Sequence, residues 1–257
     1  MNAPQISTII TNEAVANGIY KLVLQLQQAV TVVPGQFGHL TVPDAFLRRP
    51  LSIHHYCAEH NRVEFLYRVV GEGTLQLSKL AAGTSLDILL PLGNGFSVPT
   101  TAQHGLVVGG GIGVAALYES MQVSKNVQWR ACFGFRSAQE VLDVDALRQQ
   151  NIPVFVATED GSVGHKGFVT GLLEEAIATQ PVDIIHCCGP LPMLKAVQAF
   201  AMQHNIPTQL SLEERMGCGT GICRVCACKI QSATGWHYLR VCKDGPVFDA
   251  KEVVFDE

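Results

Sequence analysis

Four cysteines near the end of the 257-residue chain have a spacing that suits iron chemistry. Cys218, Cys223 and Cys226 follow the pattern C-x4-C-x2-C, and Cys242 comes after a further interval of fifteen residues. This is the thiolate spacing of a plant-type [2Fe-2S] cluster. Because a short loop wraps only one side of a two-iron cluster, a distant cysteine must close the site. The sequence therefore predicts a [2Fe-2S] centre with metal ligands Cys218, Cys223, Cys226 and Cys242.

The residues between these cysteines fit the same interpretation. Gly217, Gly219 and Gly221 lie in the loop, and glycine readily adopts the positive φ angles that turn backbone N–H groups toward sulfur. Cys228 has no place in the ligand pattern, and we expect it to be a small buried residue.

Two other uses of these cysteines compete with this interpretation. A single C-x2-C unit, here Cys223 and Cys226, also occurs in structural zinc sites, but such sites usually pair two units and the chain has no second one. A disulfide is disfavoured because the start of the chain has no secretory signal. Nine cysteines, an odd number, favour a reducing compartment, and we expect the protein to be cytoplasmic.

The composition limits the classes of partner. Charged residues make up 16% of the chain and hydrophobic residues 47%, which is ample for buried cores. The net charge of −4 leaves no basic patch, so we expect neither nucleic acid nor an anionic membrane surface as a partner. No apolar run reaches transmembrane length.

The elements that must position the cysteines fall into three parts. Residues 1–98 predict an antiparallel β-barrel, because short strands such as 19–26 and 63–70 alternate with turn residues. Residues 99–210 predict an α/β domain with a parallel sheet, because four apolar runs (105–108, 127–133, 152–157 and 182–188) alternate with helical stretches. Residues 211–257 form the small cluster domain.

The barrel contains two features of chemical interest. Arg49-Pro50-Leu51-Ser52 carries a guanidinium and a hydroxyl beside a proline, and Gly73-Thr74 precedes a predicted helix over 75–80. A glycine turn at the start of a helix can bind an anion. Each feature alone is more often a solvated edge or a capped turn. Because both features lie in one barrel, together they favour an anion site more strongly than either feature does alone.

Two loops of the α/β domain lie where nucleotides bind. The first apolar run leads into Gly109-Gly110-Gly111-Ile112-Gly113, a turn suited to a pyrophosphate, although Val114 occupies the last position of G-x-G-x-x-G. The fourth run ends in Cys188-Gly189-Pro190, which either faces a ligand or simply starts a helix. Arg136 and Ser137 either face a ribose or are a surface residue and a helix cap. The nine histidines show no metal-ligand spacing.

Taken together, these segments resemble the ferredoxin–NAD(P) reductase superfamily, and specifically the electron-transfer subunits of class 1B dihydroorotate dehydrogenases. By this resemblance the barrel holds FAD, with Arg49, Gly73 and Thr74 near the pyrophosphate. The flavin lies beside Pro50, Leu51 and Ser52, and the rest of the cofactor runs along Leu66, Tyr67 and Arg68. The second domain binds NAD, for which the expected contacts are Gly109, Gly110, Gly111, Gly113, Cys188, Gly189 and Pro190.

The resemblance also implies the activity. NADH gives a hydride to FAD, and electrons pass singly through the cluster to the FMN of a separate catalytic subunit that oxidises dihydroorotate in pyrimidine biosynthesis. No catalytic acid or base is expected in this chain, and the assembly contains two copies of each subunit. One alternative is an FAD and [2Fe-2S] subunit of a hydrogenase or of a ferredoxin–NADP oxidoreductase complex. The other is a zinc-stabilised module with no enzymatic activity.

Overall fold

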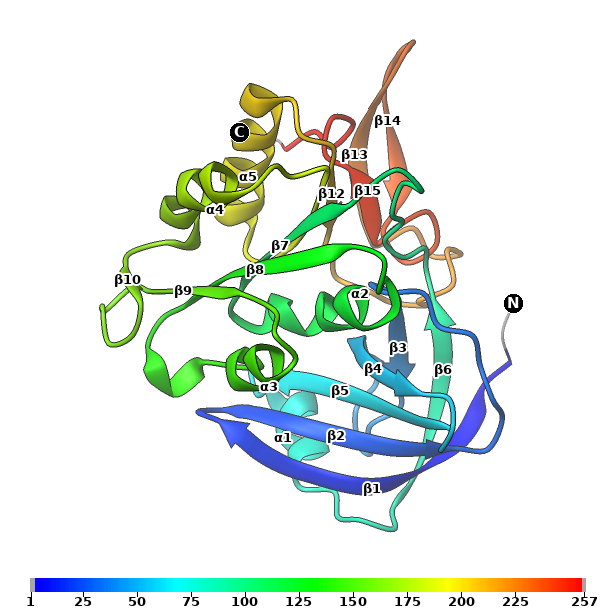
Figure 1. The fold of residues 1–257 in the computed structure, drawn as a ribbon. Helices are drawn as coiled ribbons and strands as arrows, with labels where there is room; N and C mark the ends of the chain where they lie inside the picture. The colour runs from blue at the N-terminus through cyan, green and yellow to red at the C-terminus, as the bar shows by residue number, and fades with distance from the viewer. Residues whose placement is uncertain (1–2, 256–257) are drawn as a thin grey trace.

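The computed structural model describes residues 3–255 of the chain. A barrel formed by the N-terminal third lies below a layered α/β part, and a hairpin from the C-terminal region projects at the upper right of the view (Figure 1). Among the described residues, no helix is both long and apolar enough to cross a membrane.

The predicted barrel is confirmed as six antiparallel strands that close in the order β1-β2-β5-β4-β3-β6. In β2, the side chains of Leu22, Leu24 and Leu26 are buried in the barrel core, as their alternation predicts. Between β5 and β6, helix α1 (Glu72–Ser78) begins three residues earlier than the predicted 75–80. The strands are β1 (Gln5–Ala16), β2 (Ile19–Leu26), β3 (Phe37–Leu40), β4 (Arg49–Cys57), β5 (Arg62–Arg68) and β6 (Ser85–Leu92).

The predicted parallel sheet is confirmed, and it is larger than the four apolar runs indicate. Seven strands lie in the order β10-β9-β8-β7-β11-β12-β15, and all neighbours are parallel except β12 and β15. The four predicted apolar runs correspond to β7 (His104–Gly110), β8 (Gln128–Phe135), β9 (Val154–Thr158) and β11 (Ile184–Cys188). The strands not predicted are β10 (His165–Lys166), β12 (Thr208–Ser211) and β15 (Val247–Asp249).

Helices cover both faces of this sheet, because successive residues of a buried strand point to opposite sides. In β7, Leu106 and Val108 pack on one side with α4 and α5, while Val107 packs on the other side with α2 and α3. The helices are α2 (Tyr118–Val123), α3 (Val144–Gln149), α4 (Leu173–Thr179) and α5 (Leu191–His204). Three short 3₁₀ helices are η1 (Gly111–Ala116), η2 (Ala138–Glu140) and η3 (Val169–Leu172).

The C-terminal region is tied to both other parts. Its hairpin is formed by β13 (Ala227–Ser232) and β14 (Gly235–Arg240), whereas β15 adds an antiparallel edge to the main sheet. The side chains of Cys226 and Cys242 are buried in the same hydrophobic core as Phe37 of the barrel and Leu210 of the sheet. The boundaries at 98/99 and 210/211 stay a prediction.

Candidate functional site

A pocket of about 370 Å³ lies where the three parts meet. This volume is within the range of small-molecule sites, about 300–1,000 Å³. The barrel contributes Phe37, Arg49, Pro50, Leu51, Ser52, Leu66, Tyr67, Arg68, Val70 and Thr74. The glycine loop contributes Ile112 and Ala115, and the C-terminal region contributes Ser211, Leu212, Glu213, Glu214, Met216 and Pro246. The structure thus brings together eight of the nine residues predicted to bind FAD.

The ninth residue, Gly73, lies directly beneath the guanidinium of Arg49. A Cβ atom added to Gly73 would lie only 2.1 Å from Nε of Arg49. The guanidinium donates hydrogen bonds to the backbone carbonyls of Leu47 and Arg48. Among residues 3–255 it forms no ion pair with a carboxylate. A half-buried cation without a counter-ion suits a phosphate ligand, because guanidinium binds phosphate through charge-assisted hydrogen bonds.

The start of α1 adds backbone donors beside this cation. The first helical bond runs from Leu75 N–H to the Gly71 carbonyl at 2.9 Å, so the preceding N–H groups have no partner within the helix. The hydroxyl of Thr74 accepts from the N–H groups of Val70 and Gly71 at 3.0 and 3.2 Å. Thr74 therefore shapes the turn with its side chain, and the backbone remains available to an anion.

Tyr67 and Arg68 use their polar groups within the protein. The Tyr67 hydroxyl donates to Oδ1 of Asn12 at 2.9 Å, and burial raises the pKa of this phenol. The Arg68 guanidinium donates two hydrogen bonds to the Glu140 carboxylate, at 3.0 and 2.8 Å, and this pairing lowers the pKa of Glu140. Arg68 thus joins the barrel to η2 of the α/β part.

The segment from Ser211 to Met216 is a wall of the pocket that was not predicted from the sequence. It begins at the last residue of β12, which lies between β11 and β15, and Cys218 comes two residues after its end. The sequence carries no strong signal for this role, because the segment has neither a glycine turn nor a basic side chain facing a phosphate motif. Only the packing of β12 against β11 brings it to the pocket.

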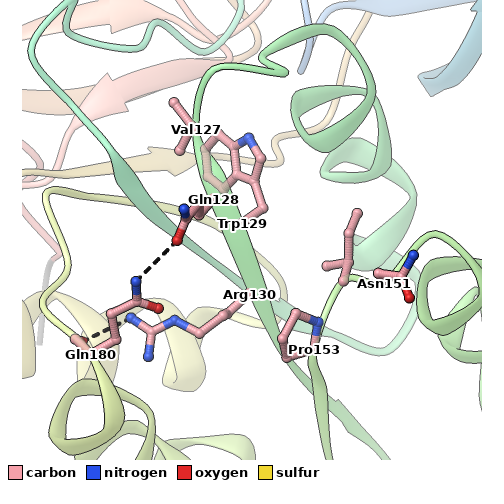
Figure 2. A pocket seen from close by; sticks show the side chains of 8 residues that line it. Val127, Gln128, Trp129, Arg130, Asn151, Pro153 and Gln180 are labelled. Carbon is pink, nitrogen blue, oxygen red and sulfur yellow. Dashed lines mark hydrogen bonds between the residues drawn. The ribbon is translucent and has the colours of Figure 1, made fainter.

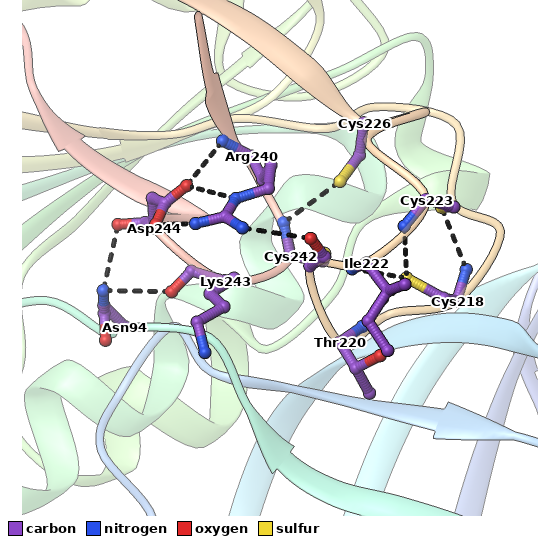
Figure 3. Close-up of polar contacts among 11 residues, drawn as sticks. Asn94, Cys218, Thr220, Ile222, Cys223, Cys226, Arg240, Cys242, Lys243 and Asp244 are labelled. Carbon is purple, nitrogen blue, oxygen red and sulfur yellow. Dashed lines mark hydrogen bonds and ion pairs between the residues drawn. The ribbon is translucent and has the colours of Figure 1, made fainter. Parts of the chain in front are cut away.

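In the cysteine loop, which runs from Gly217 to Cys226, backbone N–H groups point to the cysteine sulfur atoms (Figure 3). The N–H groups of Thr220, Ile222 and Cys223 all point to the Sγ atom of Cys218, at 3.4, 3.3 and 3.4 Å. The Cys218 N–H points to Cys223 Sγ at 3.4 Å, and the Cys242 N–H points to Cys226 Sγ at 3.4 Å. Convergent N–H groups stabilise negative charge on sulfur, as metal-bound thiolates require.

Side chains outside the loop hold it in place. Figure 3 shows the Arg240 guanidinium between the Asp244 carboxylate and the cysteine loop, where it donates to the Gly221 carbonyl at 3.0 Å. Arg240 pairs with Asp244 at 2.8 Å. The side-chain amide of Asn94 donates to the carbonyls of Lys243 and Asp244 at 3.3 and 2.9 Å, which attaches the turn after Cys242 to the segment after the barrel.

Two of the four cysteine thiols have pKa values shifted in opposite directions. Burial raises the pKa of the Cys218 thiol, but hydrogen bonds from the Cys223 and Thr220 backbone outweigh it and bring the pKa to about 6. Burial, followed by the neighbouring Cys226 thiol, raises the pKa of Cys242 to about 12. A bound metal deprotonates such a thiol outright. Among the described residues, no group of three or more His, Cys, Asp or Glu side chains is arranged to hold a metal ion, so the fit to a cluster rests on donor type and on the convergent N–H groups. Chemically the donor set fits a [2Fe-2S] cluster.

The two predicted nucleotide loops touch each other at the carboxyl edge of the sheet. A Cβ atom added to Gly113 would lie 2.5 Å from the Cys188 carbonyl oxygen, and one added to Gly189 would lie 3.0 Å from the Gly110 nitrogen. Gly111 has φ of +54° and is the first residue of η1. Gly109 and Gly110 end β7, and Pro190 precedes α5. Ligands bind at such an edge in open α/β sheets.

A second hollow, of about 350 Å³, lies at the opposite, amino-terminal edge of the sheet (Figure 2). Its buried Arg130 donates to the carbonyls of Ala176, Gln180 and Pro181 and to the Thr179 hydroxyl. Figure 2 shows this side chain reaching toward Gln180. Arg130 therefore satisfies the carbonyls at the end of α4, and no ligand role is assigned to it.

Comparison with known proteins agrees with this arrangement. Residues 213–254 match the family described as the iron-sulfur cluster binding domain of dihydroorotate dehydrogenase B. Over the whole fold, the chain superposes on a chain of an NADH-dependent reduced ferredoxin-NADP oxidoreductase with a TM-score of 0.84 and 26% identity, covering 99% of this chain and 91% of the other. Phthalate dioxygenase reductase shares the fold with a TM-score of 0.67 and 17% identity, covering 93% of this chain and 77% of the other. Fold and site thus define a ferredoxin reductase-like protein with a C-terminal iron–sulfur domain.

The sequence relatives narrow this class to one family. The dihydroorotate dehydrogenase B (NAD(+)) electron transfer subunit of Caldanaerobacter subterraneus subsp. tengcongensis is 40% identical over 248 residues, which cover 96% of this chain and 97% of the relative. The subunit of the same name from Bacillus mycoides is 41% identical over 256 residues, covering 96% of each chain. The chain belongs to the family of dihydroorotate dehydrogenase B electron transfer subunits.

Proposed function

We propose that this chain carries electrons between NAD(H) and the FMN of a dihydroorotate dehydrogenase catalytic subunit, through FAD in the pocket and a [2Fe-2S] cluster on the cysteine loop. Arg49, Gly73 and the start of α1 hold the FAD pyrophosphate, and Pro50, Leu51 and Ser52 lie beside the flavin. The glycine loop and Cys188-Gly189-Pro190 hold the nucleotide. Cys218, Cys223, Cys226 and Cys242 are the metal ligands.

The observation that carries this proposal is the continuity between the pocket and the cysteine loop. Residues 211–214 and Met216 line the same pocket as Arg49 to Ser52, and Cys218 follows Met216 after a single residue. Pro246, four residues past Cys242, lines the pocket from the other side. An electron carrier must lie close to its donor, and this connection brings the cysteine loop next to the flavin pocket.

The protein's own task is to bind, orient and shield the cofactors. When bound, FAD takes two electrons from NADH as a hydride and releases them singly, and a [2Fe-2S] cluster accepts one at a time. Leu66 and Leu212 are buried beside the pocket, where they exclude water. The N–H groups that converge on Cys218 Sγ stabilise negative charge at the cluster. These steps require no acid or base from the chain.

The exposed side of the cysteine loop supports transfer to a second protein. Ile222 and Val225 lie in the loop with 76% and 57% of their surfaces exposed. Exposed apolar side chains around a redox centre suit a protein interface. We infer an FMN-containing catalytic subunit as the partner, in an assembly with two copies of each subunit. All nine cysteines are free thiols, which supports a reducing cytoplasmic location.

The coupled reaction tests this proposal. We expect the isolated chain to reduce artificial acceptors with NADH and to leave dihydroorotate untouched, because in this proposal dihydroorotate is oxidised on the separate FMN-containing subunit. Co-expression with the catalytic subunit is expected to give a stable complex that couples dihydroorotate oxidation to NAD reduction. Native co-purification with a hydrogenase or a larger ferredoxin–NADP subunit, with no FMN protein present, would instead support the alternative.

A second prediction concerns the nucleotide loop. Replacing Gly113 by Ala places a methyl group against the Cys188 carbonyl, so the two loops must separate. Overpacking of this kind costs about 1–3 kcal/mol. We expect the KM for NADH to rise about tenfold in assays with an artificial acceptor, while flavin and iron contents remain normal. An unchanged KM would show that these loops do not bind the nucleotide. From the family resemblance we also expect NADH to be preferred over NADPH, and the same assay with NADPH tests this preference.

A further inference from the structure

His39 of the barrel is buried beside the cysteine loop without a hydrogen-bond partner. Its side chain is fully buried, and neither ring nitrogen has a partner among residues 3–255. A neutral imidazole always carries one N–H, and the Arg48 and Cys218 carbonyls that approach this ring lack hydrogen-bond geometry, so the buried donor is unsatisfied whichever tautomer is present. Buried polar groups are rarely left unpaired, and each exception calls for an explanation such as a missing ligand.

The ring of His39 faces the cluster loop. A Cβ atom added to Gly219 would lie 2.5 Å from Nδ1 of His39 and 3.1 Å from its Cε1. Gly219 has φ of +68° and stands between Cys218 and Thr220, whose N–H points to Cys218 Sγ. The imidazole therefore packs where the loop bends around the first cysteine, and only glycine leaves room for it.

The same histidine is one strand away from the flavin pocket. In the pairing of β3 with β4, His39 lies opposite Pro50, and Phe37 lies opposite Ser52. Phe37, Pro50 and Ser52 all line the pocket. Arg48 fixes the strand at this point, because its guanidinium donates to the His39 carbonyl at 3.1 Å. His39 is thus held rigidly between the pocket wall and the cysteine loop.

We propose that His39 is a positioning residue that donates a hydrogen bond from its ring to a sulfur of the cluster held at Cys218. The inference rests on the proposed function, since the acceptor is the cluster. A sulfur bound to reduced iron is more negative than one bound to oxidised iron, so a donated hydrogen bond favours the reduced state. His39 thereby raises the reduction potential of the cluster and keeps the loop against β3.

The test compares the full chain, purified without oxygen, with three variants. His39→Leu removes the donor, and His39→Asn keeps an N–H near the position of Nδ1. His60→Leu is the control, because this histidine is exposed in the turn between β4 and β5. The midpoint potential of the cluster is measured by redox titration followed by electron paramagnetic resonance, and iron is counted in every sample.

We expect His39→Leu to make reduction of the cluster about tenfold less favourable, a shift of about 59 mV to lower potential for one electron. His39→Asn should recover most of this shift, and His60→Leu should match the unaltered chain. Loss of the cluster in His39→Leu with its retention in His39→Asn would also support the proposal.

Three results would overturn it: an unchanged potential in His39→Leu, equal shifts in both His39 variants, or loss of the cluster in both. The last two would mean that ring volume matters and the donor does not. If the unaltered chain holds no iron, the proposed function itself fails.

Discussion

Replacement of Cys218, Cys223, Cys226 or Cys242 by serine is expected to remove the iron–sulfur cluster from the purified chain. All four sulfurs lie in or next to the loop whose backbone N–H groups converge on Cys218 and Cys223, and Cys226 and Cys242 are buried, so a serine hydroxyl there is a poor substitute for a thiolate ligand. The unaltered chain should carry about two iron and two acid-labile sulfide ions, and each variant should carry close to none.

Cys228→Ser is the matched control for this experiment. Cys228 is only two residues from Cys226 and is buried, but it lies in β13 opposite Leu239, outside the loop. Burial raises the pKa of its thiol to about 12, as expected for a cysteine used only for packing. This variant should keep its iron. Stoichiometric zinc in a sample of the unaltered chain prepared without oxygen would contradict the cluster assignment.

Arg49→Ala is expected to weaken FAD binding roughly ten- to a hundredfold. The guanidinium lies over Gly73 at the start of α1, and no carboxylate among the described residues neutralises it. Its removal deletes a charge-assisted hydrogen bond to phosphate, which is worth about 1.5–3 kcal/mol. The flavin dissociation constant, measured by fluorescence on reconstituted apoprotein, reports the effect.

Two further variants make this result specific. Arg49→Lys keeps the charge but loses the planar fork, so its FAD affinity should lie between those of Arg49→Ala and the unaltered chain. Arg62→Ala removes an exposed arginine at the start of β5, away from the pocket, and should leave the constant unchanged. An unaltered dissociation constant in Arg49→Ala would show that Arg49 only stabilises the loop through the Leu47 and Arg48 carbonyls.

The fold class could be predicted from the sequence because local apolar patterns indicate which residues are buried. Alternating Leu22, Leu24 and Leu26 can bury one face only as a strand, and continuous apolar runs such as 105–108 indicate strands covered on both faces. Strands β10, β12 and β15 were missed. They have two to four residues each, too few for a period to be recognised, and they form because a neighbouring edge is available.

By itself the sequence determined which residues are candidates to bind iron, a phosphate or a nucleotide, because that prediction depends on residue type and on spacing within a short loop. The tertiary structure alone decided which of these loops meet. Gly113 against Cys188, Ser211 to Met216 beside Arg49, and His39 against Gly219 are contacts between segments far apart in the chain. An apolar or glycine pattern in the sequence indicates that a surface will be buried. Which other surface buries it depends on the order of the strands and on the packing of the helices around the whole core.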